Sequence, residues 1–251
     1  MNTLYLQCNM GAAGDMLTAA LYELLPDPEQ FLHDLNHMGL PGVEFHPLPA
    51  QSCGITGTHM DVVVHGEREE SVDHHHDHHH DHDHHHHAHE HSHQHHHHHT
   101  SLHDVEHLIS HLNLPAPVLE QARGVYHRLA QAESKAHGQP VDLVHFHEVG
   151  ALDAVADVAA ACYALYLLNP DQVVVSPVHV GSGMVRCAHG IVPVPAPATS
   201  HLLEGVPCYG GDIQGELCTP TGAALLTTFA THFGPMPPMV LEKTGYGMGK
   251  K

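Results

Sequence analysis

The sequence predicts a mixed α/β (α+β) fold, built as a single main domain with a disordered histidine-rich insertion. Two short apolar runs, at 4–6 and 173–175, have the length and composition of buried strands. Several longer stretches carry apolar residues every three or four positions, which is the pattern of helices that cover a sheet. Residues 73–100 lack any such pattern and separate an N-terminal α/β part, 1–72, from a helical and α/β part of the same domain, 101–251.

The first predicted strand, Leu4–Leu6, runs into the glycine-bearing segment 11–15, and helical spacing begins at Leu17. A strand-to-helix turn of this kind exposes backbone N–H groups that suit a phosphate or a carboxylate. It lacks the lysine of a Walker A loop and the full G-x-G-x-x-G spacing, so an ordinary tight turn is at least as well supported. Asp15 is a candidate catalytic residue or simply an acid in the first turn of a helix.

Residues 26–40 have the apolar spacing of a second helix, with Gly39 placed to end it. Residues 43–64 then predict β structure, with strands at 43–45 and 61–64 and a turn region at 53–57. No chemical role is predicted for this part of the chain.

The histidine-rich insertion is the compositional outlier. Nineteen of the 26 positions from His74 to His99 are histidine, and no apolar residue there is larger than alanine. Such a segment cannot bury a core, so it should be a disordered loop. Its internal position and interleaved acids favour a native metal-loading tract over an expression tag, although imidazole alone does not select among nickel, copper and zinc.

Two amphipathic helices should follow the insertion, one opened by Thr100-Ser101 and one covering 118–136. Three histidines fall on the outer side of the first helix at i, i+4 and i+8: His103, His107 and His111. They are equally compatible with a solvent-exposed face and with a metal-transit site beside the insertion.

The densest group of potential metal ligands begins at residue 145. His145 and His147 are two apart, so on an extended segment both rings point to one face, and Glu148 should begin a helix that runs to about Leu168. Imidazole and carboxylate groups bind transition metals, so H-x-H-E favours a metal or acid/base site over hydrogen-bonded core histidines. Two further acids lie on the small-residue side of the predicted helix: Asp153 and Asp157.

The strand predicted at 173–175 leads into a glycine-rich loop. Gly181 and Gly183 would let a ligand approach the backbone closely, and the guanidinium of Arg186 is well formed for phosphate or carboxylate. Softer metal ligands lie nearby: His179, Cys187 and His189. A hairpin turn with a surface arginine and hydrogen-bonded histidines is the competing interpretation, and it is stronger for His179 than for 186–189.

A last helix should precede the C-terminus, because Thr219 fits the N-cap and Pro220 the first helical position. This helix start, with Thr221, is a second candidate anion site. Glu216 just before it is either an acid/base group or only an acid at the end of a strand. The chain ends in a predicted glycine-rich turn at 244–249, as if it were cut just before another element.

Composition narrows the classes of function. Eight lysines and arginines stand against 28 acidic residues, a formal net charge of −20 with neutral histidines, so binding to nucleic acid or to an anionic membrane is not expected. No run of 18 apolar residues and no signal peptide is present, which predicts a cytoplasmic protein. The six cysteines form no C-x-x-C pair, which argues against a zinc ribbon or a disulfide framework.

Together these motifs resemble the nickel insertion proteins of the nickel-pincer cofactor pathway, the LarC type. The resemblance covers nearly the whole chain and is carried by the histidine-rich insertion and by four blocks: LYLQCNMGAAGDM at 4–16, HFHEVGALDAVADV at 145–158, VGSGMVRCAHGIVPVPAPAT at 180–199 and GELCTPTGAALL at 215–226. The chain departs from the family pattern at Gln7, where Asp is usual, and at His179, where Asn is usual.

The resemblance implies a CTP-dependent nickel insertion enzyme, a chelatase of the lyase class. Such proteins place Ni²⁺ in a pyridinium bisthiocarboxylic acid mononucleotide, bonded to two sulfurs and a ring carbon, and the product activates the lactate racemase apoenzyme and related enzymes. The family has a C-terminal domain, implicated in binding CTP with Mn²⁺ or Mg²⁺, which some members reach by programmed ribosomal frameshifting. This chain resembles the form made without that domain; it should act only together with it, and as a homo-oligomer.

On this basis the insertion should concentrate nickel, and His145, His147 and Glu148 should hold it. The further candidate metal ligands are Asp153, Asp157 and His189. The groups expected to position the mononucleotide are Gly181, Gly183, Arg186, Thr219 and Thr221. Glu148 is the predicted proton acceptor, and the other acid/base candidates are Glu216 and Asp15. A non-catalytic nickel store or metallochaperone, or a metal-dependent hydrolase, would use the same residues.

Overall fold

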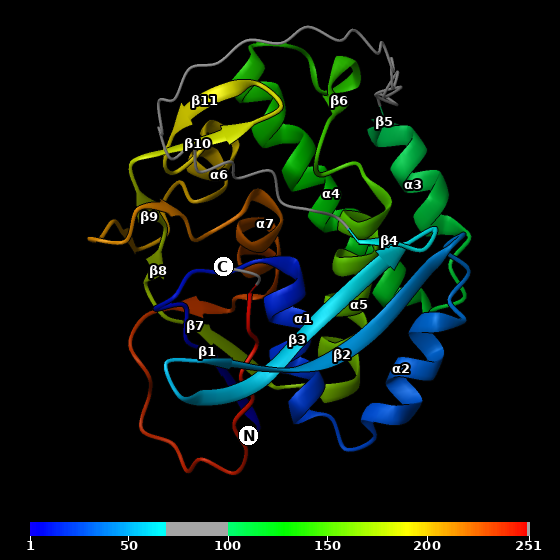
Figure 1. Cartoon of the computed structure of the whole chain (residues 1–251), viewed down its shortest axis with the longest axis vertical. Helices are drawn as coiled ribbons and strands as arrows, with labels where there is room; N and C mark the ends of the chain where they lie inside the picture. Colours follow the sequence, from blue (N-terminus) through cyan, green and yellow to red (C-terminus); the bar gives the residue numbers. More distant parts are fainter. Residues whose placement is uncertain (69–99, 250–251) are drawn as a thin grey trace, which may run out of the picture.

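A parallel three-stranded sheet carries the N-terminus and forms one side of the molecule in the computed structural model, which describes residues 1–68 and 100–249 (Figure 1). Its order is β1 (Thr3–Leu6), β7 (Gln172–Val175) and β14 (His232–Phe233). The strands predicted at 4–6 and 173–175 are confirmed, and they pair in register from Thr3 with Gln172 to Leu6 with Val175. The predicted insertion, apart from Thr100, lies outside the described residues.

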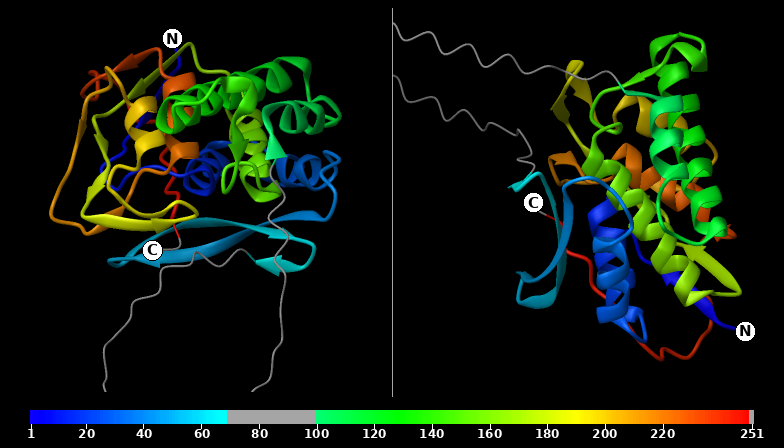
Figure 2. Two further views of the ribbon diagram at one scale, coloured as in Figure 1. Left: turned by 90° about the horizontal axis from the view of Figure 1, so that it is seen from above. Right: turned by 90° about the vertical axis from the view of Figure 1, so that its right-hand side faces the viewer.

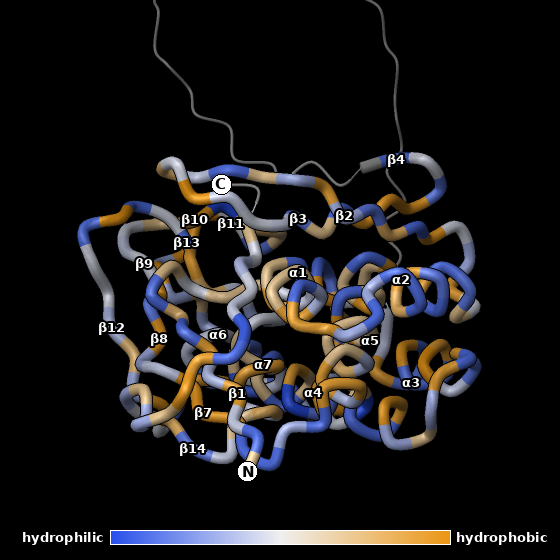
Figure 3. Tube along the Cα trace, turned by 90° about the horizontal axis from the view of Figure 1, so that it is seen from below, coloured by the Kyte–Doolittle hydropathy of each residue, from blue (hydrophilic) through white to orange (hydrophobic). Residues whose placement is uncertain are grey.

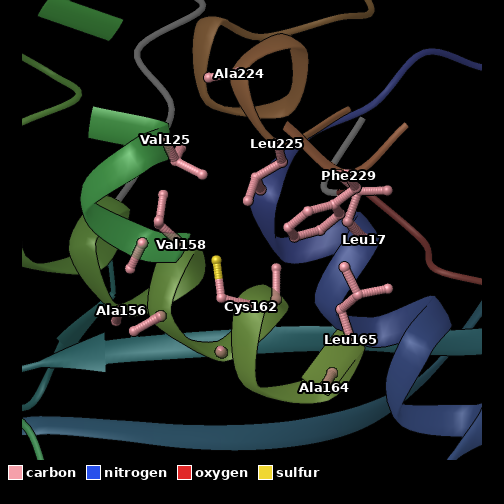
Figure 4. Close-up of a cluster of buried hydrophobic side chains, with 14 of the residues drawn as sticks. Leu17, Val125, Ala156, Val158, Cys162, Ala164, Leu165, Ala224, Leu225 and Phe229 are labelled. Carbon is pink, nitrogen blue, oxygen red and sulfur yellow. The ribbon is translucent and has the colours of Figure 1, made fainter. Parts of the chain in front are cut away.

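Four helices pack beside this sheet: α1 (Gly14–Leu24), α4 (Ala116–His137), α5 (Leu152–Leu168) and α7 (Pro220–Phe229). Figure 4 shows their shared core, in which Leu17 of α1, Val125 of α4 and Phe229 of α7 surround Cys162 of α5. Helix α5 lies at the centre and is buried on nearly all sides. Its many alanines allow the neighbouring helices to approach closely, because a small side chain keeps two helix axes near each other.

A long hairpin covers α1 and α5 as a layer of its own (Figures 1 and 2). It consists of β2 (Val43–Ser52) and β3 (Ile55–Val64), joined by a turn in which Cys53 and Gly54 have φ values of 51° and 81°. Positive φ at both central residues is the mark of a two-residue type I′ turn. The turn region predicted at 53–57 is therefore too long, since residues 55–57 already pair with β2.

The C-terminal segment lies between this hairpin and α1. Thr58 N–H donates to Tyr246 O at 2.9 Å, and Met248 N–H donates to Thr58 O at 2.8 Å. A Cβ on Gly247 would stand 1.8 Å from Met16 O, so glycine is required here by close packing. The predicted glycine-rich turn at 244–249 is wrong, because these glycines let an extended segment pass against α1.

The helix predicted before the hairpin and the first helix predicted after the insertion are also confirmed, with shifted ends. Helix α2 (Pro28–Asn36) is shorter than predicted, because the Asp27 side chain accepts from Gln30 N–H and caps it there. Helix α3 (Leu102–Ser110) begins with a capping box between Ser101 and Asp104. In Figure 3 both α2 and α3 carry hydrophilic and hydrophobic residues, as expected of helices that bury one side. None of the helices within 1–68 and 100–249 has the length and apolar character needed to cross a membrane.

The remaining elements are short and connect these layers. They are β4 (Glu67–Arg68), β5 (Thr100–Ser101), η1 (Val141–Leu143), β6 (His145–Phe146), β8 (Val178–His179), β9 (Gly181–Ser182), β10 (Met184–Cys187), β11 (Gly190–Pro193), α6 (Pro197–Leu202), β12 (Cys208–Tyr209) and β13 (Gly215–Glu216).

The predicted start of the helix at Glu148 is wrong, because α5 begins only at Leu152. Residues 147–151 instead form a loop, in which Ala151 N–H donates to Glu148 O at 3.2 Å. Gly150 packs tightly in this loop: a Cβ there would stand 2.6 Å from Phe146 Cβ and 3.0 Å from Cβ of Thr100, which is distant in the sequence. Such contacts are invisible to helical periodicity.

Candidate functional site

A cleft of about 2370 Å³ extends along β1, α1 and the C-terminal segment, and its lining includes the N-terminal ends of three helices, α1, α5 and α7. Ala13, Ala151 and Thr219, the N-cap residues of these helices, all lie on its lining. The first turn of a helix presents N–H groups without intrahelical acceptors and the positive end of the helix dipole. This part of the cleft therefore favours a bound anion, despite the acidic composition of the chain.

The starts of α1 and α7 are locked side by side by backbone hydrogen bonds. Ala12 N–H donates to Leu217 O at 3.0 Å, and Thr219 N–H donates to Ala12 O at 3.0 Å. Two glycines make the contact close enough: a Cβ on Gly11 would stand 1.8 Å from Leu217 O, and one on Gly222 would stand 2.1 Å from Ala12 O. The glycine-bearing turn singled out in the sequence thus joins two helix starts.

The predicted start of α7 is confirmed in detail. Thr219 is the N-cap and its hydroxyl accepts from Gly222 N–H at 3.1 Å, while Pro220 occupies the first helical position. Thr221 follows at the second position, where the helix itself supplies no acceptor for the N–H, and it lies on the cleft lining. Its role as an anion ligand stays a prediction.

Five acids predicted as functional line the same cleft: Asp15, Glu148, Asp153, Asp157 and Glu216. They come from α1, the loop before α5, α5 itself and β13. A Cβ on Gly14 would stand 2.8 Å from Asp157 Oδ2, so α1 packs directly on this carboxylate. Asp15 Oδ2 lies 3.7 Å from His59 Nδ1 of the hairpin. The acids supply the hard oxygen ligands of the cleft and candidate proton acceptors.

Arg186 is the basic residue best placed for an anionic ligand. It projects from β10, is exposed, and shares the lining with Lys243, the other lysine or arginine of the described residues found there. Lys243 Nζ donates to Leu25 O at 3.1 Å and so helps to hold the C-terminal segment. A planar guanidinium can bind a phosphate or carboxylate through two N–H groups.

The loop that carries His147 and Glu148 is held from two sides. Glu148 Oε1 accepts from Ala188 N–H at 2.9 Å, which ties the loop to the turn between β10 and β11. On the inner side the buried Tyr126 hydroxyl donates to Val149 O at 3.0 Å. The Tyr126 ring also meets Phe146 edge-on, with centroids 5.8 Å apart. Glu148 therefore faces the cleft from a fixed loop.

Replacing Tyr126 by Phe should lower the free energy of unfolding by about 1–3 kcal/mol, because the buried Val149 carbonyl loses its donor. Amide hydrogen exchange at 147–151 should rise as the loop loosens. Tyr163→Phe is the matched control, since it removes a hydroxyl that donates to Asp34 at 2.7 Å, away from this loop. Equal exchange at 147–151 in both variants would contradict the positioning role of Tyr126.

Three imidazoles and a thiol meet at the rim of the cleft, and we call them the rim cluster: His137, His147, Cys187 and His189. The ring centroids of His137 and His189 are 4.7 Å apart, and those of His147 and His189 are 4.8 Å apart. Cys187 Sγ lies 3.9 Å from His189 Nδ1. His137, on the last turn of α4, was not predicted as functional, because its only local signal is the ordinary i, i+4 spacing from Glu133.

Glu133 lies behind the rim cluster. Its Oε2 is 3.4 Å from His137 Nε2. Burial raises the pKa of the Glu133 carboxyl, and the nearby His137 and His189 act in the opposite direction. Within 1–68 and 100–249 no three His, Cys, Asp or Glu side chains already stand at coordinating geometry. Metal binding to any of these residues would therefore require side-chain rotation.

Several predicted site residues do not line the cleft: His145, Gly181, Gly183 and His189. His145 is exposed on β6 opposite Ser101, and β6 ends at Phe146, so the expectation that both H-x-H rings share one strand face is wrong. A Cβ on Gly181 would stand 2.0 Å from Gly215 O, and one on Gly183 would stand 2.4 Å from Gln214 Oε1. Packing against 214–215 explains both glycines without a ligand.

Two other potential ligands are core residues. His179 is buried, its Nδ1–H donates to Asn9 O at 2.8 Å, and its ring stacks on Tyr209. Cys8 lies on the cleft lining, yet burial raises the pKa of its thiol to about 12. A thiol that stays protonated is a poor metal ligand, because metals bind the thiolate.

Comparison with known proteins points to one family. The family described as "Nickel insertion protein" matches residues 4–251. A relative in Desulfitobacterium hafniense is 38% identical over 251 residues, covering 100% of this chain and 55% of that protein. Relatives in Geobacillus kaustophilus and Clostridium kluyveri are 36% and 37% identical, again over 100% of this chain and over 56% and 59% of those proteins. All three are named "Pyridinium-3,5-bisthiocarboxylic acid mononucleotide nickel insertion protein".

The chain thus spans little more than half the length of these curated relatives. No solved structure matches it.

Proposed function

The chain belongs to the nickel insertion protein family, and on that premise we propose that it takes part in inserting Ni²⁺ into pyridinium-3,5-bisthiocarboxylic acid mononucleotide. The observation that supports this most is the meeting of two kinds of group in one cleft. Helix starts and Arg186 suit the anionic nucleotide, and imidazole and carboxylate groups beside them suit a divalent metal.

The mononucleotide phosphate would lie at the adjoining starts of α1 and α7, where Thr219 and Thr221 line the cleft, with Arg186 as its counter-charge. Nickel would be held from the loop before α5 by His147 and Glu148. Asp153 and Asp157 would be its neighbours on α5. His145 and the glycines of β9 and its loop have no part in this arrangement, because they lie outside the cleft lining.

The reaction replaces one proton of the substrate with nickel. The two thiocarboxylate sulfurs bind Ni²⁺, the C–H bond of the ring carbon between them breaks, and its electron pair forms the nickel–carbon bond. The proton must pass to a base. Glu148 is our choice, because a carboxylate that accepts one bond from Ala188 N–H keeps further acceptor capacity. Glu216 and Asp15 are the alternative bases on the lining.

We assign the nucleotide-consuming step to the part of the relatives that this chain does not span. CTP with Mn²⁺ or Mg²⁺ would bind there, and the two parts together would form the chelatase, an enzyme of the lyase class. Among the described residues, the helix starts on the cleft lining carry no lysine of the kind found in phosphate loops, which supports this division. The product would pass to the lactate racemase apoenzyme or a related enzyme, and the working form would be a homo-oligomer.

Product formation, measured against mere nickel retention, tests the proposal. Protein, Ni²⁺ and mononucleotide are incubated with CTP and Mn²⁺ or Mg²⁺, with and without the remaining part of a relative, and then treated with a strong chelator. We expect a nickel-bearing nucleotide that survives the chelator only when both parts are present. Complete return of nickel to the chelator with both parts present would identify a nickel store.

Deleting His74–His99 should sharply lower the amount of nickel bound per chain but leave product formation largely intact at saturating nickel. The segment offers 19 imidazoles and would act as a buffer of many weak sites. A Gly/Ser linker of equal length is the matched control, since it keeps the connection between the flanking parts. Equilibrium dialysis gives the nickel count. Loss of all product in a folded deletion variant would show that the tract belongs to the reaction centre.

A further inference from the structure

The rim cluster joins elements that are distant in the sequence. His137 ends α4, and His147 lies in the loop before α5. Cys187 ends β10, and His189 lies in the turn between β10 and β11. His147 and Cys187 line the cleft, whereas His137 and His189 lie outside its lining. The cluster therefore straddles the edge between solvent and the cleft.

From this arrangement we infer that the rim cluster is a nickel docking site, which captures Ni²⁺ at the mouth of the cleft before the ion reaches the carboxylates inside. The later transfer of the ion to the cleft rests on the proposed function. Its capture at the rim rests on the cluster alone. Three imidazoles and a thiol are the borderline and soft ligands that suit Ni²⁺ and not Mg²⁺ or Mn²⁺.

The spacing supports binding of one ion. Two ligand atoms that each lie about 2.0–2.3 Å from a metal, at angles near those of tetrahedral or square sites, are about 3–4 Å from each other. Cys187 Sγ and His189 Nδ1 are 3.9 Å apart. The rings of His137 and His147 each contact the ring of His189, with centroids 4.7 and 4.8 Å away, so rotation about their side-chain bonds would complete the set.

Glu133 acts on this site as a positioning residue. Its carboxylate faces His137 Nε2 at 3.4 Å, which leaves Nδ1 of that ring for the metal. Ligating histidines commonly bind a carboxylate through their other nitrogen, and loss of such a partner lowers metal affinity by about 10–100-fold. The Glu148 contact with Ala188 N–H, at 2.9 Å, places the first interior carboxylate directly beside the cluster.

Thiolate-to-nickel charge-transfer absorption in the near ultraviolet tests the inference on the full chain. The histidine-rich insertion has no cysteine, so its nickel does not contribute to this band. Titration with Ni²⁺ alone should produce the band, Cys187→Ser should remove it, and His137→Ala should weaken the site that gives it by at least about tenfold. Glu133→Gln should weaken the same site by about tenfold or more.

Matched controls exist for both ligand types. Cys208→Ser removes an exposed cysteine outside the cluster, whereas Cys187 is partly buried. His201→Ala removes a histidine of α6 whose Nδ1 lies 2.8 Å from Glu204 Oε1. This histidine–glutamate pair resembles the pair of His137 and Glu133 but lies outside the rim cluster. Both controls should leave the band and its affinity unchanged. If Cys187→Ser fails to fold, His189→Ala replaces it in the test. That variant should weaken nickel binding at the cluster by at least about tenfold, as expected for His137→Ala.

A band that persists unchanged in folded His137→Ala and Cys187→Ser variants would overturn the inference, as would a band that depends on Cys53 or Cys208. The titration contains no mononucleotide, so it is independent of product formation. A protein with an intact, His137-dependent band but no insertion activity would keep the docking site and refute only the proposed reaction.

Discussion

Replacing Glu148 by Gln should slow formation of the nickel–carbon bond by about 10²–10⁴-fold, which is the usual contribution of a positioned general base. The amide has nearly the same size and can still accept from Ala188 N–H, a bond that measures 2.9 Å for the carboxylate. The loop should therefore keep its place while the proton acceptor is lost, and saturating nickel offsets the weaker metal contact that the amide would make. Single-turnover kinetics under saturating nickel would measure the effect on the chemical step.

Glu120→Gln, at an exposed position on α4 away from the cleft lining, is the matched control and should leave the rate unchanged. The charge-transfer band of the rim cluster should persist in Glu148→Gln, because that carboxylate is not part of the cluster. A Glu148→Gln rate within a few-fold of the parent would contradict the assignment of the base and direct attention to Glu216 and Asp15.

Replacing Arg186 by Met should raise KM for the mononucleotide by about 10–100-fold, because a hydrogen bond to a charged group contributes about 1.5–3 kcal/mol. The effect on kcat should be smaller if the guanidinium binds substrate and transition state alike. The KM of Arg186→Lys should fall between those of the parent and of Arg186→Met, since lysine keeps the charge but lacks the planar guanidinium.

Arg128→Met serves as control, because Arg128 is exposed on α4 and does not line the cleft. Inorganic phosphate should compete with the mononucleotide in the parent protein and much less in Arg186→Met. Unchanged KM in Arg186→Met would show that Arg186 does not bind the phosphate, which the starts of α1 and α7 would then hold alone.

Features encoded by neighbouring residues could be predicted from the sequence. Thr219 and Pro220 define the start of α7 by local capping chemistry. The valines at 173–175 form a strand because β-branched side chains favour extended, buried backbone. The α+β class followed from such local signals. The helix start at Thr219 did so as well, whereas its role as an anion site stays a prediction.

Features set by distant contacts could not be predicted. Glu148 lies in a loop because Tyr126 and Gly150 hold 147–151 out of helical geometry, and Tyr126 lies 23 residues from Val149. Gly181 must be glycine because a Cβ there would stand 2.0 Å from Gly215 O, and the local sequence does not reveal this contact. His137 joins His189 only because the end of α4 meets the turn after β10. The sequence shows the ligand types, whereas the fold decides which of them meet.

Exchange of a ring proton for nickel in this cleft can be followed with a mononucleotide deuterated at the ring carbon between the thiocarboxylates. Mass spectrometry of the nucleotide after incubation with Ni²⁺, CTP and both parts of the protein follows nickel and deuterium together. We predict that the nucleotide loses one deuterium for each nickel that it gains. In Glu148→Gln it should neither lose deuterium nor gain nickel. Nickel that is bound and released while the deuterium is fully retained would contradict the account.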